Sequence, residues 1–136
     1  MSAMQRRPLP VRHVLLATDL ERPSRRATDE AIRLAAEHGA VLLVLAVART
    51  HHDRVRLEAG IGVIADRARA AGVTATTLVW HGNPAEAIVQ AAWTERADIV
   101  VLGSRRRRNL RRMLLGSVSS HVANEAACRV VIVPSS

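Results

Sequence analysis

Five short, largely apolar segments alternate with longer segments whose apolar residues recur every three to four positions, and this alternation restricts the possible folds most strongly. The apolar segments, each a predicted strand, are Val11–Thr18, Val41–Ala48, Thr74–Trp80, Asp98–Leu102 and Arg129–Val133. Val41–Ala48 (VLLVLAVA) is apolar throughout, so both of its faces must be covered. Because strands that alternate with helices form parallel sheets with helices on both faces, the sequence predicts a single-domain α/β fold with the order βαβαβαβαβ.

The first two intervening segments carry helix signals. Ser24 is the predicted N-cap of a helix that stops at Gly39. A second helix is predicted over Arg54–Ala71. Gly60 and Gly62 should soften its first half, because each glycine costs a helix up to about 1 kcal/mol relative to alanine.

The other two predicted helices begin with distinct start signals. Asn83 is the predicted N-cap of the third helix, with Pro84 in the first turn and Glu86 three residues after the cap. Gly116 and Ser117 open the fourth helix. Because a Gly-Ser helix start leaves N–H donors unpaired at the positive end of the helix dipole, it is a predicted anion site.

The amino-terminal residues differ in character from the rest of the chain. Residues 1–10 (MSAMQRRPLP) are polar and contain proline, so we expect a flexible tail before a domain at residues 11–136. They lack the apolar core of a signal peptide, and no apolar run in the chain approaches the roughly 20 residues that cross a bilayer. We therefore expect a cytoplasmic protein without membrane contact. The lone Cys128 fits a reducing compartment and is expected to be a small buried apolar residue.

The net charge of +8 comes from arginine, since the chain contains no lysine. A cluster lies after the fourth predicted strand: Arg105, Arg106, Arg107, Arg108, Arg111 and Arg112. Three interpretations of this loop stay open: a solvated segment, contact with nucleotide phosphates, or contact with nucleic acid. Nucleic acid is the least favoured, because base recognition needs aromatic or base-reading groups and the only aromatic residues are Trp80 and Trp93, each within a predicted element.

Several motifs together resemble the universal stress protein (UspA-like) family over nearly the whole chain. Gly103, Gly116 and Ser117 fall on the G-x2-G-x9-G-[ST] spacing of its nucleotide-binding members. The other matches are Ala17–Asp19 to Pro-Thr-Asp, Gly82–Glu86 to G-x-P-A-E, Ala97–Val101 to A-D-x-hydrophobic, and Asn109–Ser119 to N-L-x-x-x-L-L-G-S-V-[ST].

The resemblance implies an adenine nucleotide alpha hydrolase-like fold with strand order 3-2-1-4-5. In that order the crevice lies between strands one and four, where Asp19 and Gly103 follow their strands. The resemblance also implies a stress-response regulatory module that can hold an adenine nucleotide, such as ATP with or without Mg²⁺. The predicted nucleotide-binding residues are Ala17, Thr18, Asp19, Val47, Gly103, Ser104, Arg105, Arg106, Gly116, Ser117, Val118 and Ser119.

Arg106 departs from the family pattern, because it occupies the second glycine of the motif. If that position needs a left-handed backbone, a residue other than glycine costs about 1 to 2 kcal/mol there. The loop can instead relax elsewhere, and the guanidinium can pair with phosphates. A dimer of this family that binds no nucleotide is therefore an alternative to the nucleotide-binding form.

A phosphate-hydrolysing enzyme that uses Arg105–Arg112 is a further alternative. Against it, the sequence shows no paired carboxylates, no Walker-type lysine, and no nucleophile arrangement around Ser117 and Ser119. The six histidines do not have the spacing of metal ligands. We therefore expect a binding module without catalytic residues and without a metal site.

The last predicted strand carries consecutive β-branched residues: Val130, Val131, Ile132 and Val133. With the order 3-2-1-4-5 this strand lies at an edge of the sheet, where unpaired N–H and C=O groups invite another chain. No charge or proline interrupts its apolar run. We therefore expect a homodimer in which the two last strands pair antiparallel across a two-fold axis, an arrangement that the family resemblance also implies.

Overall fold

The computed structural model describes residues 10–21, 24–104 and 116–134. The flexible tail predicted at residues 1–10 lies almost wholly outside these ranges, and so does the arginine cluster at 105–112. The strands are β1 (His13–Ala17), β2 (Val41–Ala48), β3 (Ala75–His81), β4 (Ile99–Ser104) and β5 (Arg129–Pro134). The helices are α1 (Arg25–His38), α2 (Asp53–Ala70), α3 (Pro84–Thr94) and α4 (Ser117–Glu125). The predicted βαβαβαβαβ order is confirmed.

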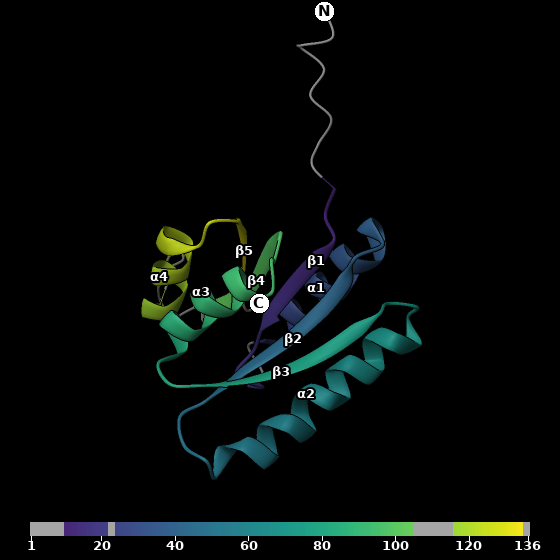
Figure 1. Cartoon of the computed structure of the whole chain (residues 1–136). Coiled ribbons are helices and arrows are strands. Elements are labelled where there is room, and N and C mark those ends of the chain that lie inside the picture. The colour runs from purple at the N-terminus through teal and green to yellow at the C-terminus, as the bar shows by residue number, and fades with distance from the viewer. Residues whose placement is uncertain (1–9, 22–23, 105–115, 135–136) are drawn as a thin grey trace, which may run out of the picture.

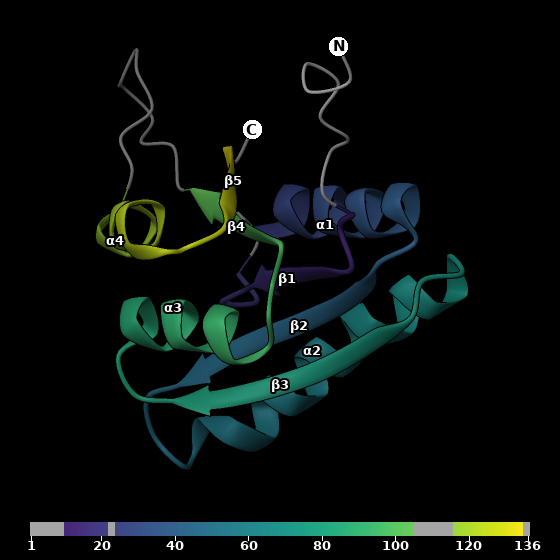
Figure 2. The ribbon, with the colours of Figure 1, turned by 45° about the horizontal axis from the view of Figure 1, so that its top comes forward.

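The strands form one parallel sheet in the order β3-β2-β1-β4-β5, which confirms the predicted order 3-2-1-4-5. β1 lies in the middle, with Leu15 opposite Leu43 of β2 and Val100 of β4. Helices α1 and α2 cover one face of the sheet, and α3 and α4 cover the other (Figure 1; Figure 2). None of the described helices is long and apolar enough to span a membrane.

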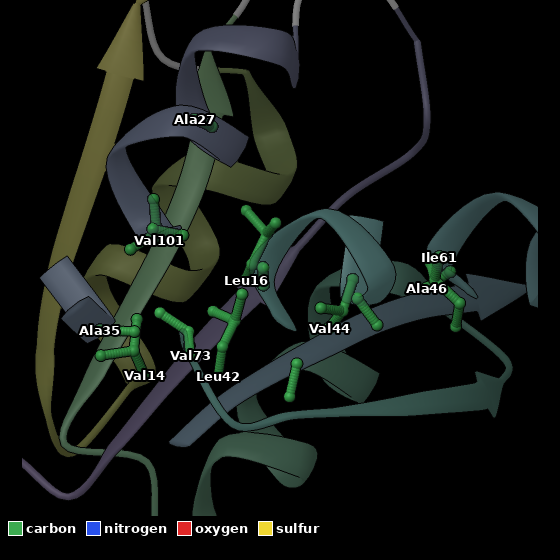
Figure 3. Packing of buried hydrophobic residues seen from close by; sticks show 14 of the residues in the cluster. Val14, Leu16, Ala27, Ala35, Leu42, Val44, Ala46, Ile61, Val73 and Val101 are labelled. Carbon is green, nitrogen blue, oxygen red and sulfur yellow. The ribbon is translucent and has the colours of Figure 1, made fainter. Parts of the chain in front are cut away.

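The alternation of side chains along the central strands builds a separate core on each face of the sheet. Val14 and Leu16 of β1 point toward α1 and α2, whereas Leu15 and Ala17 belong to the cluster under α3 and α4. Figure 3 shows residues of the first cluster, to which α1 contributes Ala27 and Ala35. Since both faces are covered, the central strands need apolar residues at every position, which is the pattern of the sequence.

The first strand is shorter than the predicted Val11–Thr18. It begins at His13 and ends at Ala17. The Asp98 carboxylate accepts hydrogen bonds from the backbone N–H groups of Arg12 (2.8 Å) and His13 (3.0 Å). These N–H groups are therefore satisfied by a side chain just before the ladder begins. The other element boundaries differ from the predicted ones by one or two residues at most, a range typical of helix and strand ends.

Ser24 occupies the predicted N-cap position directly before α1, but its side chain does not cap the helix. Its backbone has already entered the helical region, and its side chain makes no hydrogen bond to the N–H groups of α1. Its Oγ donates instead to the Asp19 carboxylate at 2.7 Å, a charge-assisted bond that is stronger than a bond to a neutral partner. The predicted cap of α3 is confirmed, since the side chain of Asn83 accepts from the N–H of Glu86 at 3.1 Å.

Helix α2 continues without a break through both of its glycines. A Cβ at Gly60 would overlap with Cδ1 of Leu20 and would lie 3.2 Å from its Cγ, whereas a Cβ at Gly62 would meet nothing within 4 Å. Gly60 therefore has a packing role, because its missing side chain lets α2 approach the turn after β1.

Cys128 lies just before β5 and is partly buried against the second core cluster. Burial raises the pKa of its thiol above the usual value, and the nearby Asp98 carboxylate raises it further. The thiol therefore stays protonated at neutral pH, and its surroundings are those of a packing residue.

Candidate functional site

A pocket of about 860 Å³ opens at the carboxyl ends of β1, β2 and β4. Helix α1, the next helix after β1, lies on one face of the sheet, and α4, the next helix after β4, lies on the other face. In an open parallel sheet, the carboxyl ends of two such neighbouring strands are the usual place for a ligand. The volume lies within the range of small-molecule sites, roughly 300 to 1,000 Å³.

Most of the residues selected from the sequence meet at this pocket. The predicted residues that line it are Ala17, Thr18, Asp19, Val47, Gly103, Gly116, Ser117, Val118 and Ser119. Ser104 does not line it: this residue is the last of β4, is only 2% exposed, and its Oγ has no hydrogen-bond partner among the residues that the structure describes. Arg105 and Arg106 lie outside the described residues.

A tight turn after β1 holds Asp19 at the pocket. Its carboxylate accepts hydrogen bonds from the N–H of Glu21 (2.9 Å) and from Ser24 Oγ (2.7 Å). The Thr18 hydroxyl accepts from the N–H of Leu20 at 3.0 Å. Leu20 has a φ of 65°, a left-handed conformation that is costly for a leucine and that these hydrogen bonds help to maintain. Asp19 therefore shapes the wall of the pocket as well as contributing a charge to it.

Helix α4 directs its first turn at the opposite side of the pocket. Gly116 precedes the helix in an extended conformation, with φ −67° and ψ 169°, and has no side chain that could cap it. The first N–H groups of a helix have no partner within the helix. Because Gly116, Ser117, Val118 and Ser119 all line the pocket, these donors and the positive end of the helix dipole suit an anionic group there.

One wall of the pocket was not predicted from the sequence, and it is formed by the residue after β2 and by the start of α2. Its residues are Arg49, Asp53, Arg56 and Leu57, and the other lining residues that were not predicted are Glu21, Ser24, Leu45, Pro84, Ile88 and Leu102. Arg49 comes directly after β2, so its place at a strand end could have pointed to it. The α2 residues had no such signal, because their position depends on how the helix packs.

The pocket combines an apolar part with a charged part. Leu45, Val47, Leu57 and Ile88 supply apolar surface, whereas two arginines and three carboxylates supply charge. No group of His, Cys, Asp and Glu side chains that could hold a metal ion occurs within residues 10–21, 24–104 and 116–134. The arrangement suits a ligand with a flat apolar portion joined to an anionic portion.

Comparison with known proteins agrees with this architecture. The model of the Universal stress protein family matches residues 10–134. The "Universal stress protein in QAH/OAS sulfhydrylase 3′region" of Thermus aquaticus is 36% identical over 132 residues, which cover 88% of this chain and 96% of that protein. Universal stress protein YxiE of Bacillus subtilis is 32% identical over 143 residues, with coverage of 88% and 97%.

A solved structure is similar over the same region. The crystal structure of a universal stress protein in complex with cAMP aligns with 93% of this chain and 99% of that chain, at 30% identity and a TM-score of 0.75. Sequence and fold therefore agree along almost the whole length. The chain belongs to the universal stress protein family.

Proposed function

We propose that this chain is a cytoplasmic regulatory module that binds an adenine nucleotide in the pocket at the carboxyl ends of β1, β2 and β4. The observation that carries the proposal is that the first turn of α4, whose N–H groups have no acceptor within the helix, and the apolar surface around Val47 line the same pocket. The crystallised relative that holds cAMP supports it, since that protein is 30% identical to this chain.

In the proposed arrangement, the base lies against Val47 and the phosphates lie at Gly116 and Ser117. The N–H donors of α4 suit the phosphates, and the apolar wall suits the base. Asp19 lies in the turn after β1, the strand between β2 and β4, and in this proposal it accepts hydrogen bonds from ribose hydroxyl groups. Arg105 and Arg106 stay predicted phosphate contacts.

The proposed role is binding without catalysis. Two of the three carboxylates at the pocket already have structural partners: Asp19 accepts from Ser24, and Asp53 lies 3.9 Å from the guanidinium of Arg56. In this proposal Mg²⁺ enters with the nucleotide, because the phosphates themselves supply the oxygen ligands that it prefers.

Replacing Ser117 tests the proposed phosphate site. The substitution Ser117→Asp adds a negative charge at the first residue of α4, where it favours the helix but repels phosphate. We expect calorimetry to show that the variant binds ATP more weakly by roughly 1.5 to 3 kcal/mol, the contribution of a hydrogen bond to a charged group. Asn124→Asp, an exposed change near the other end of α4, should leave the affinity unchanged. Failure of the unmodified protein to bind ATP, AMP or cAMP at millimolar concentration would refute the proposed function.

We also propose that the protein is a homodimer that pairs through β5. In the described part of the chain, β5 pairs with β4 alone. A groove of about 400 Å³ lies beside it, lined by Val131–Pro134 and by Arg26, Asp29, Glu30 and Arg33 of α1. Since α1 contributes two positive and two negative charges to this groove, the surface can complement a second copy of itself across a two-fold axis.

A further inference from the structure

The pocket contains no aromatic ring among its described lining residues. The chain has no phenylalanine or tyrosine, and Trp80 packs into the core cluster under α3, although it is the register partner of Val47. Nucleic-acid-binding proteins commonly hold an unpaired base by stacking on an aromatic side chain or on the guanidinium plane of an arginine. The described planar groups that could serve are therefore the guanidinium groups of Arg49 and Arg56.

Arg49 is the better placed of these two arginines. Arg49 comes directly after β2, which ends at Ala48, and it lines the same pocket as Leu45 and Val47 of that strand. It is exposed and forms no ion pair with the described residues. Arg56, by contrast, already lies within 3.9 Å of Asp53.

The order of the strands indicates that the phosphates and the base of a nucleotide lie at different sides of the pocket. The anion donors of α4 follow β4, and Arg49 follows β2, with β1 between these strands. Neighbouring strands lie about 4.8 Å apart, so the two sides are separated by roughly 10 Å. A nucleotide whose phosphates lie at α4 therefore presents its base, and not its phosphates, to Arg49.

We propose that Arg49 stacks its guanidinium plane on the base of the bound nucleotide and so replaces the missing aromatic side chain. This inference rests on the proposed binding of an adenine nucleotide in the pocket. A guanidinium is planar, delocalised and weakly hydrated, and these properties let it lie flat on a ring. A lysine ammonium is a compact and strongly hydrated charge, so it cannot form the same contact.

Adenosine is the appropriate probe, because it carries the base without any phosphate. Calorimetry should show that Arg49→Lys and Arg49→Met both weaken adenosine binding, by about 3- to 30-fold. Arg54→Lys is the matched control, because Arg54 lies outside the pocket and pairs with Glu58 at 2.7 Å. This control should bind adenosine as the unmodified protein does.

Two further measurements separate stacking from a purely electrostatic role. Adenosine should shift the Arg49 side-chain proton resonances upfield by its ring current, and inorganic tripolyphosphate should not. The stacking role is overturned if Arg49→Lys retains the full affinity for adenosine. It is also overturned if the variants at position 49 lower the affinity for tripolyphosphate and not that for adenosine. In both cases the proposed function stands. If the unmodified protein binds neither adenosine nor ATP, both fail.

Discussion

At the scale of single residues, the absent side chain of Gly60 decides how closely α2 approaches the pocket. Leu20 fills the space over this glycine and follows Asp19 directly in the chain. A side chain at position 60 would push on Leu20, whose backbone is already left-handed. The two glycines of α2 look equivalent in the sequence, and only their neighbours distinguish them.

Alanine substitutions at these glycines should change stability in opposite directions. Gly62→Ala should raise the free energy of unfolding by about 0.5 to 1 kcal/mol, because alanine favours the helix and nothing obstructs its Cβ. Gly60→Ala should lower it by about 1 kcal/mol, because overpacking against Leu20 exceeds the helical gain. Urea denaturation of both variants measures these values. Equal stabilisation by the two substitutions would show that the Leu20 side chain can move aside without a cost in stability.

At the scale of elements, α1 and α3 begin in different ways although both follow a plausible capping residue. Asn83 caps α3, since its side-chain oxygen accepts from the N–H of Glu86. Ser24 stands close to the Asp19 carboxylate and donates to it, so α1 begins without a side-chain cap. The hydrogen bond from Ser24 to Asp19 links the start of α1 to the pocket. It does not satisfy any N–H group of α1.

Removing the cap of α3 should destabilise the protein. Asn83→Ala leaves the N–H of Glu86 without its acceptor, and the free energy of unfolding should fall by about 1 kcal/mol. Asn83→Asp retains a side-chain oxygen and should restore most of the loss. Asn124→Ala, at an exposed position in α4, is the control for losing an asparagine elsewhere. A similar loss in this control would contradict the assigned cap.

At the scale of the whole molecule, the sheet ends at a strand that is apolar on both sides. Val131 and Val133 pack toward α1, whereas Val130 and Ile132 pack toward the cluster of α3 and α4. All four side chains stay partly exposed, because no described strand follows β5. Association through this edge would satisfy its backbone groups and bury more of its apolar surface.

Proline in β5 tests the proposed dimer. Light scattering should find the unmodified protein as a dimer at micromolar concentration, and a monomer there would overturn the proposal. Val131→Pro or Ile132→Pro removes a backbone donor and should yield a monomer, or an aggregate if the edge is indispensable. Val131→Ala trims the side chain but keeps the donor, so it should remain dimeric.

Much of the candidate site could be predicted because it lies at strand ends and at a helix start. Asp19 comes after β1, Gly103 lies near the end of β4, and Gly116 precedes α4, so each has a local signal. Arg49 had the weaker signal of following directly on β2. Asp53, Arg56 and Leu57 had none, since the direction in which a helix points its side chains depends on its packing.

The sequence by itself determined the order of the elements, the parallel sheet and the family, because strand and helix periods, helix starts and the spacing of motif residues are local properties of the chain. Only the tertiary structure decided which partner each polar side chain bonds to and where a missing side chain lets two elements pack closely. Ser24 donates to Asp19, Asp98 satisfies the start of β1, and Gly60 makes room for Leu20. The contacts of Asp98 and Gly60 join residues far apart in the chain, and the contact of Ser24 depends on the conformation of the turn after β1, so the sequence pattern revealed none of them.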